Sequence, residues 1–244
     1  MTAIRTENLR KEYGDTVAVD GLDLEIDEGE LFSLLGVNGA GKTTTIKMLS
    51  TLTKPTSGEA YVLGFDVSKD SAKIKELIDV SMQETAVARK LTVEENVEFY
   101  ARLSGQSEKE AEETKKYVYE AFGLGEVAKK QASKLSGGWQ RKLSIALALV
   151  TRPKLLFLDE PTLGLDVIAR RELWKTIRAL KGRMTIILTT HYMEEAEALS
   201  DRIGIMKGGR LLFVGTKEEL YAATGKSSVE DAFISVVSGG DLDA

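Results

Sequence analysis

The chain has 244 residues, a length that allows a single large α/β domain. Its 33 basic and 38 acidic residues give a net charge of −5, which argues against a general nucleic-acid binder or a basic membrane-surface protein. Cysteine is absent and there is one histidine, so disulfides, thiolate metal sites, cysteine nucleophiles and multi-histidine metal centres are excluded.

Short apolar runs predict the strands of a parallel sheet. Residues 22–26 alternate between apolar and polar, whereas residues 31–35 are almost continuously apolar and are followed by glycine. A continuous run is typical of a strand buried on both faces, and residues 155–158 and 185–189 have the same character. Each run precedes a polar or glycine-containing turn and then a helical pattern, so the sequence predicts βαβ units.

The middle and the end of the chain have other patterns. From about residue 91 to 150 the composition is helical and charged, with capping boxes expected at Thr92 and Ser107, so we expect a mostly helical insertion of about 60 residues. Two apolar runs, 203–206 and 210–214, flank Lys207-Gly208-Gly209 and predict a β-hairpin. The Gly/Asp stretch at the end is expected to fray.

A glycine-rich segment predicts a phosphate-binding loop. Residues 36–43 read Gly-Val-Asn-Gly-Ala-Gly-Lys-Thr, which fits G-x-x-x-x-G-K-[ST] between an apolar strand and an amphipathic stretch. The glycines let successive backbone N–H groups surround an anion at a helix N-terminus. Lys42 would reach the β- and γ-phosphates and Thr43 would offer its hydroxyl to magnesium. The alternative is a glycine-rich turn with a solvated lysine, which both flanking segments disfavour.

Polar residues follow two of the apolar runs. In an open α/β sheet, ligands bind at the carboxyl ends of the strands, where Asp159, Glu160 and His191 are expected. Asp159 would hold the hydration shell of magnesium, and Glu160 would orient or deprotonate the attacking water. The imidazole of His191 could donate to a phosphate. Taken singly, the two acids could be a cap and a solvated side chain, and a lone histidine is more often structural.

A second helix start also has the chemistry of an anion site. Residues 135–138 read Leu-Ser-Gly-Gly and precede an apolar helical run. Ser136 is a suitable N-cap and the glycines expose backbone N–H groups. An ordinary N-cap explains this segment equally well from physics alone, because a second phosphate-binding element has no obvious use within one subunit.

Together these motifs resemble the nucleotide-binding subunit of ATP-binding-cassette (ABC) transporters, over essentially the whole chain. Residues 36–44 match the family's Walker A motif, 155–160 its Walker B motif, 135–138 its signature, and 163–166 its D-loop. The resemblance implies ATP and Mg²⁺ as ligands. It implies ATP-binding residues Tyr13, Gly36, Asn38, Gly39, Ala40, Gly41, Lys42, Thr43 and Thr44, residues Ser136, Gly137, Gly138 and Asp166 acting in trans, catalytic residues Glu160, His191 and Gln83, and magnesium contacts Thr43, Gln83 and Asp159.

The resemblance also implies a fold and an assembly. The expected fold is a P-loop NTPase (RecA-like) α/β core with an N-terminal antiparallel β subdomain and an inserted helical subdomain. One ABC ATPase domain would span residues 1–244, with the core at about 1–83 and 151–244 and the helical subdomain at about 84–150. Two such subunits, identical or related, would pair head to tail on ATP binding, so that each signature completes the other's site.

The implied partner is a membrane-spanning permease, with no nucleic acid and no direct lipid binding. No apolar stretch approaches the about 20 residues of a spanning helix, and no signal peptide is recognisable. We therefore expect a cytoplasmic protein held at the inner face of the cell membrane by its permease. Features such as Thr189–Glu197 resemble the bacterial drug, sodium or polysaccharide exporter branch. Trp139 departs from the usual glutamine of the signature, which leaves the interface packing there open.

Two other functions are compatible with a phosphate loop. One is a soluble mechanoenzyme of the same superfamily that acts on nucleic acid or the ribosome, but such chains resemble coiled-coil or tandem two-cassette proteins. The other is a small-molecule kinase or GTPase, which would not need Leu-Ser-Gly-Gly. The sequence favours an ATP-hydrolysing motor that powers export through a separate membrane subunit.

Overall fold

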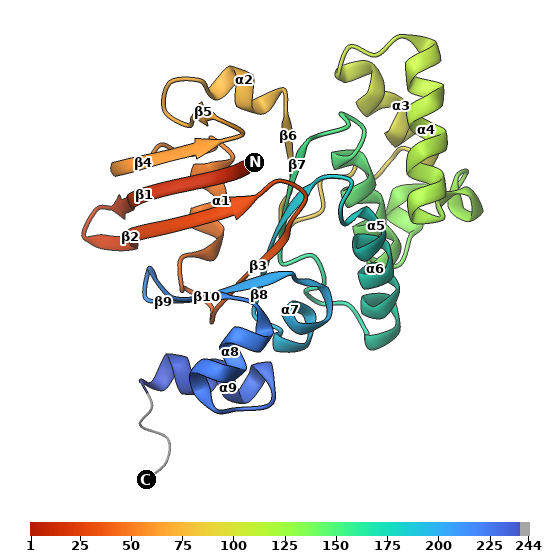
Figure 1. The fold of residues 1–244 in the computed structure, drawn as a ribbon. Helices are drawn as coiled ribbons and strands as arrows, with labels where there is room; N and C mark the ends of the chain where they lie inside the picture. The colour runs from red at the N-terminus through yellow and green to blue at the C-terminus, as the bar shows by residue number, and fades with distance from the viewer. Residues whose placement is uncertain (240–244) are drawn as a thin grey trace.

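The computed structural model describes residues 1–239, and the expected frayed ending lies almost wholly outside them. Its strands form two sheets (Figure 1). The antiparallel sheet has the order β2-β1-β4-β5, and the larger sheet has the order β10-β9-β3-β8-β7-β6. The strands are β1 (Thr2–Tyr13), β2 (Thr16–Asp27), β3 (Leu31–Leu35), β4 (Ser57–Val62), β5 (Phe65–Asp66), β6 (Ile78–Ser81), β7 (Leu155–Asp159), β8 (Thr185–Thr190), β9 (Arg202–Lys207) and β10 (Arg210–Gly215).

The larger sheet is parallel from β9 to β6, and only β10 pairs antiparallel. Leu35 of β3 pairs with Thr190 of β8, Asp159 of β7 pairs with Thr189, and Ser81 of β6 pairs with Leu158. This register brings the carboxyl ends of four strands to one edge of the sheet. The segments that follow these strands therefore start side by side.

The continuous apolar run of β7 is buried on both faces, as the sequence predicts. Leu156 and Leu158 pack in a core with the helices of the middle of the chain. Leu155 and Phe157 point the other way and pack in a core with the antiparallel sheet and α1. Alternation along one strand thus builds the two main cores of the fold.

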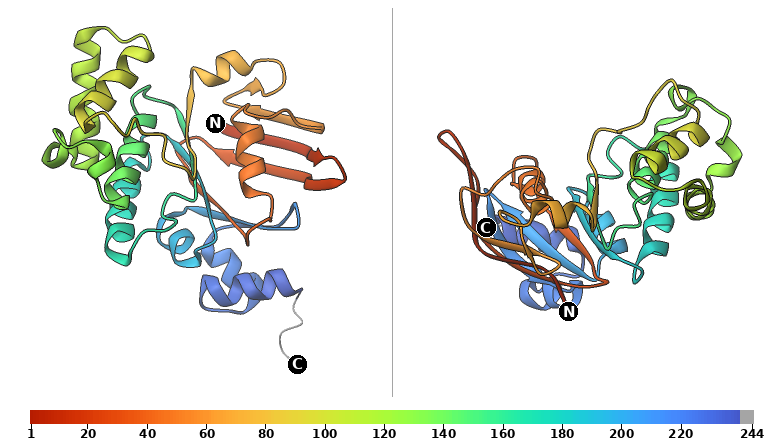
Figure 2. Two further views of the ribbon diagram at one scale, coloured as in Figure 1. Left: turned by 180° about the vertical axis from the view of Figure 1, so that it is seen from behind. Right: turned by 90° about the horizontal axis from the view of Figure 1, so that it is seen from above.

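Helices cover the larger sheet and extend beyond it. They are α1 (Lys42–Leu49), α2 (Ser71–Lys75), α3 (Val93–Leu103), α4 (Glu108–Phe122), α5 (Gly137–Ala148), α6 (Val167–Leu180), α7 (Met193–Leu199), α8 (Lys217–Thr224) and α9 (Val229–Ser238), with short 3-10 turns η1 (Leu124–Val127) and η2 (Ala132–Lys134). The antiparallel sheet lies on one side of the larger sheet and α3 and α4 lie on the other (Figures 1 and 2).

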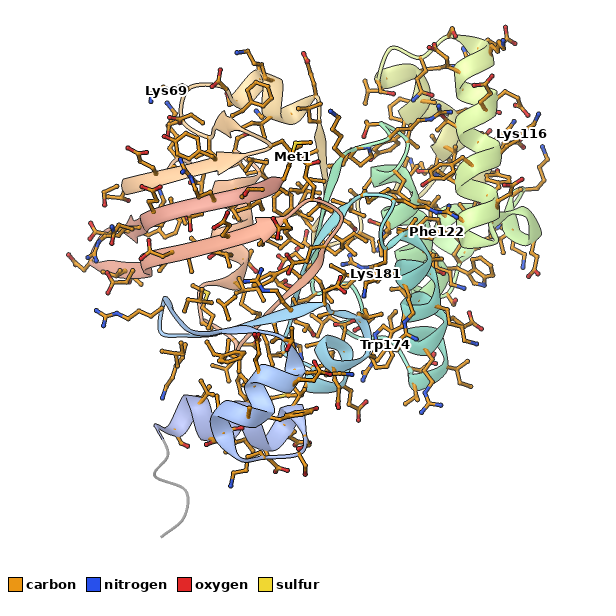
Figure 3. All side chains as sticks on the ribbon, viewed as in Figure 1. Met1, Lys69, Lys116, Phe122, Trp174 and Lys181 are labelled. Carbon is orange, nitrogen blue, oxygen red and sulfur yellow. The ribbon has the colours of Figure 1, made fainter. Side chains whose placement is uncertain are left out.

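The helical insertion has the predicted start signals. Thr92 and Ser107 cap α3 and α4, and both capping boxes are complete. Helix α5 connects the insertion to the rest of the fold, because it packs on α3 and α4 and also on α6 and β6. Phe122 on α4 and Trp174 on α6 lie on this helical side of the molecule (Figure 3).

The C-terminal hairpin is confirmed, and the extent of the first sheet is the main correction. Strands β9 and β10 pair antiparallel across Gly208 and Gly209, which both have positive φ. Strand β2 begins at Thr16 rather than at residue 22, because its first half also pairs with β1. That half carries polar and exposed residues, so the alternation of apolar residues in the sequence does not reveal it. Within residues 1–239, no helix combines the length and hydrophobicity needed to cross a lipid bilayer.

Candidate functional site: a nucleotide cavity at the carboxyl edge of the sheet

The predicted phosphate loop joins β3 to α1 and depends on two glycines. Gly41 is the residue before α1 and has φ +107°, a region that side chains disfavour. A Cβ atom on Gly41 would lie 2.5 Å from the carbonyl oxygen of Ala18, and one on Gly36 would lie 2.5 Å from that of Met206. Both positions therefore exclude a larger residue, because the loop lies directly against the neighbouring backbone.

The loop holds its lysine below the surface. Lys42 is 4% exposed, and its Nζ donates hydrogen bonds to the carbonyl oxygens of Gly36 (2.7 Å) and Val37 (3.2 Å). The same ammonium lies 3.4 Å from Oε1 of Glu160. Burial lowers the pKa of Lys42, and the charge of Glu160 opposes that shift. The arrangement places one cation where β3 and β7 end.

Asp159 is buried with one oxygen satisfied and one free. Its Oδ1 accepts hydrogen bonds from Oγ1 of Thr43 (3.1 Å) and from Oγ1 of Thr189. Its Oδ2 is buried and has no hydrogen-bond partner in the structure. A buried carboxylate oxygen beside a threonine hydroxyl is the oxygen chemistry that Mg²⁺ prefers. The residues present thus fit a magnesium ion that completes its shell with phosphate and water.

Glu160 has a strained backbone that is held in place by its neighbours. Its φ is +46°, which is uncommon for a residue with a side chain. Its N–H donates to the carbonyl oxygen and to Oγ1 of Thr189, both at 3.1 Å. Its Oε2 lies 3.0 Å from Nδ1 of His191, whose ring packs 4.2 Å from that of Tyr192. The predicted base and the predicted phosphate donor are therefore in direct contact.

These groups face one cavity of about 510 Å³. It brings together the predicted phosphate loop, the predicted base, the histidine and the glutamine that follows β6. The lining residues are Thr16, Val17, Ala18, Asn38, Gly39, Ala40, Gly41, Lys42, Thr43, Thr44, Gln83, Glu160, Leu163 and His191. Gly36 and Asp159 lie behind this surface, where they contact Lys42 and Thr43.

The predicted in-trans residues lie outside this cavity. Ser136 caps α5, with its Oγ accepting from the N–H of Trp139 at 3.5 Å, and Ser136 and Gly137 are exposed. Asp166 is likewise exposed and caps α6, its Oδ1 accepting from the N–H groups of Ile168 and Ala169 at 2.9 Å. The chain thus contains a second capped helix start, at which Ser136 and Gly137 are exposed to solvent.

Tyr13 also lies outside the lining residues. It is 48% exposed, and Nζ of Lys11 lies 4.9 Å from the centre of its ring. Tyr13 pairs with Thr16 across the β1–β2 turn, and Thr16 begins the segment of β2 that lines the cavity. The backbone of Tyr13 therefore lies beside that of a cavity-lining residue in the sheet.

Comparison with known proteins decides the family. The sequence profile of the family described as ABC transporter matches residues 19–163, more than half of the chain. This protein belongs to the ATP-binding subunits of ABC transporters. It is therefore an ABC ATPase with the P-loop NTPase fold, as the sequence predicts.

Relatives of this ABC ATPase include two resistance proteins. It is 40% identical to "Daunorubicin resistance ATP-binding protein DrrA3" of Streptomyces coeruleorubidus, over 94% of this chain and 73% of that protein. It is 39% identical to "Linearmycin resistance ATP-binding protein LnrL" of Bacillus subtilis, over 96% of this chain and 76% of that protein. Among solved structures, cbiO1 from Clostridium perfringens, part of the ABC transporter complex cbiONQ, matches with a TM-score of 0.84, 29% identity and 91% coverage of each chain.

The structure adds site residues of this ABC ATPase that sequence reasoning missed. Thr189 joins Asp159 to the backbone of Glu160, and its place at the end of an apolar strand was an available signal. Residues 16–18 line the cavity from β2, for which the sequence offers no motif. The buried guanidinium of Arg141 contacts the backbone on both sides of Glu160 and had no recognisable signal.

Proposed function

We propose that this ABC ATPase binds ATP with Mg²⁺ in sites shared by two subunits, and that hydrolysis there powers export through a separate membrane-spanning partner. One observation carries the shared site. The cavity is lined by the phosphate loop, Glu160, His191 and Gln83, whereas Ser136 and Gly137 at the start of α5 are exposed and are not among the lining residues. A second copy, identical or related, would supply that helix start to the open side of each bound ATP.

Phosphate binding would use the groups around α1. The backbone N–H groups of residues 39–44 and the ammonium of Lys42 would contact the phosphates, which would compete with Glu160 for that ammonium. Thr43, the free Oδ2 of Asp159 and the side chain of Gln83 would hold magnesium, directly or through water. Magnesium supplies charge neutralisation at the phosphates. Tyr13 would stack on the adenine at the edge of the cavity.

Hydrolysis would be assisted by Glu160. Its carboxylate lies between Lys42 and His191, so it can orient a water and accept a proton from it. His191 would donate to the γ-phosphate, and its contact with Glu160 would keep both side chains aimed at the same point. In trans, Ser136, Gly137 and Gly138 would donate to the phosphates and Asp166 would approach across the interface.

Export is proposed from the relatives. Two of them are named as resistance ATP-binding proteins, for daunorubicin in one case and linearmycin in the other. We propose that this subunit acts on the inner face of the cell membrane, bound to its permease, and that the helical region of about residues 84–150 contacts that partner. The mechanoenzyme alternative is not favoured, because two relatives are named as resistance ATP-binding proteins and cbiO1 is part of the ABC transporter complex cbiONQ.

The test is the substitution Glu160→Gln. It keeps the size of the side chain and removes the base, so hydrolysis should slow at least ~10²-fold while ATP binding is retained. The ATP-bound dimer should then accumulate, which light scattering with ATP and Mg²⁺ would detect. Glu194→Gln removes an exposed carboxylate of α7 and serves as the matched control. Hydrolysis by Glu160→Gln at the wild-type rate would remove Glu160 from the mechanism.

A further inference from the structure

Arg141 on α5 is buried among backbone carbonyls rather than paired with an acid. Its side chain is 4% exposed. Nε donates to the carbonyl oxygen of Pro161 at 2.8 Å, and Nη2 donates to that of Asp159 at 2.9 Å. Nη1 donates to the carbonyl oxygens of Met82 at 2.5 Å and Gln83 at 3.2 Å. One guanidinium thus joins the segment that follows β6 to the segment that follows β7.

Arginine has the geometry that this position requires. A guanidinium has five N–H donors in a rigid plane, whereas an ammonium has three donors around one atom. Burial lowers the pKa of Arg141 to about 10, so the group stays charged at neutral pH, and the charges of Asp159 and Glu195 favour that state. Hydrogen bonds from a charged donor are also stronger than neutral ones.

The first pair of hydrogen bonds encloses Glu160. The two carbonyl groups belong to Asp159 and Pro161, the residues immediately before and after it. Between them Glu160 keeps its positive φ, with its N–H held by Thr189. A backbone in this region persists where the surroundings fix it from several sides. Arg141 and Thr189 together hold the backbone of Glu160 and its two neighbours. They thereby set the direction in which the Glu160 side chain and its carboxylate project.

The second pair of hydrogen bonds fixes Gln83. The side chain of Gln83 lines the cavity, and its backbone is otherwise in an irregular segment after β6. Because the same guanidinium binds both segments, it sets the separation between Gln83 and Glu160. Arg141 is also on α5, the helix that Ser136 caps. A movement of the start of α5 would therefore be transmitted by Arg141 to the segments that contain Gln83 and Glu160.

We propose that Arg141 is a positioning residue for ATP hydrolysis, which holds Glu160 and Gln83 in their working geometry and ties that geometry to α5. The proposal rests on the proposed roles of Glu160 and Gln83. Arg141 itself lines no part of the cavity, so it acts through the backbone of the other two residues.

The first test is the kinetics of Arg141→Met and Arg141→Lys. Methionine keeps much of the length and removes every donor, so kcat should fall at least ~10-fold, while KM for ATP stays within about threefold because the phosphate loop is untouched. Lysine keeps the charge but cannot span both segments, so the kcat of Arg141→Lys should lie between those of the wild-type protein and Arg141→Met. Arg178→Met, which removes another guanidinium bound to a backbone carbonyl, should keep the wild-type rate. Wild-type kcat in both Arg141 variants would overturn the proposal.

The decisive test combines the Arg141 substitutions with Glu160→Gln. If Arg141 acts through Glu160 and Gln83, either substitution should lower the residual single-turnover rate of Glu160→Gln by a smaller factor than it lowers the wild-type rate, because only the part that acts through Gln83 remains. A general structural role would instead lower that rate by the same factor as in the wild-type background, and that result would overturn the proposal. Should Arg141→Met fail to fold, Arg141→Lys carries the same comparison. An active Glu160→Gln single variant would show that the proposed site fails, a result separate from any effect of Arg141.

Discussion

The two helix starts with anion-binding chemistry differ in their surroundings. The start of α1 lies at the carboxyl edge of the sheet, with a buried cation, a buried carboxylate and a cavity in front of it. The start of α5 has a serine cap and glycines but is exposed, and nothing within residues 1–239 completes it. The difference supports our proposal that one chain supplies most of one nucleotide site and a separate part of a second site.

The surface next to the D-loop supports the same conclusion. Ile168 is 74% exposed and Val167 is 63% exposed, although both are apolar residues at the start of α6. They directly follow Asp166, which is one of the residues that we propose to act in trans. Exposed apolar side chains beside an incomplete site favour coverage by a second subunit.

The largest effect is expected from damaging each helix start in turn. Lys42→Ala removes the cation of the cavity, and Ser136→Arg blocks the second helix start with bulk, so each variant alone should lose at least ~10²-fold of its ATPase rate. A mixed dimer would contain one doubly damaged site and one intact site. Mixing the two proteins should therefore restore activity, up to about half per dimer if the sites act independently. A mixture as inactive as its components would contradict independent shared sites.

A smaller effect is expected at the exposed apolar surface. Ile168→Ser should change the free energy of unfolding of the monomer by less than about 0.5 kcal/mol, because the side chain is already in water. It should nevertheless weaken ATP-dependent dimerisation about 3- to 10-fold, the usual loss for one apolar interface contact. Leu212→Ser on β10, where the leucine is 45% exposed, is the control and should leave dimerisation unchanged. Equal effects of the two substitutions would remove α6 from the interface.

The smallest effect on activity is expected from a partly buried charge outside both helix starts. Burial raises the pKa of Asp79 on β6 to about 6, against the hydrogen bond that Thr151 donates to it. The unfolded chain has the ordinary value of about 3.9, so the folded protein binds this proton more tightly and loses stability as the pH rises from about 4 to 6.

Asp79→Asn removes that loss. It should raise the free energy of unfolding at pH 8 by at most about 3 kcal/mol, a gain that vanishes near pH 4, and it should leave the ATPase rate unchanged. Urea unfolding at the two pH values would measure this. An equal gain at both pH values would mean that the charge of Asp79 is not the cause.

The sequence predicts the elements whose side chains alternate between water and core, or are apolar on both faces. Strands β3, β7 and β8 belong to this group, because their apolar pattern and their burial agree. The starts of α3 and α4 are also predicted, because a capping box is a local sequence pattern. Strands β1 and β4 carry no comparable run, because their few buried apolar residues, such as Ile4 and Val62, are separated by polar ones and strand pairing completes the sheet. Their presence in the fold was predicted only through the family resemblance.

The same distinction applies to the site. Gly36, Lys42 and Glu160 belong to local motifs, so spacing alone predicts their positions. The contact of Thr43 with Asp159, 116 residues away in the chain, depends on strand order, which the motifs do not specify. The contacts of Arg141 could not be predicted from the sequence. They depend on which backbone carbonyl groups surround the guanidinium in the fold, and such contacts need no particular side chain at the partner positions.

The most direct test of the shared site is a crosslink between the two helix starts of different subunits. The chain has no cysteine, so Asn38→Cys in one subunit and Gly137→Cys in another, distinguished by size tags, give a clean background. With ATP and Mg²⁺, and with Glu160→Gln to slow hydrolysis, oxidation should give a band that contains both tags, and omission of ATP should remove it. Failure of that band to form with ATP, while each cysteine remains reactive, would contradict a site shared between subunits.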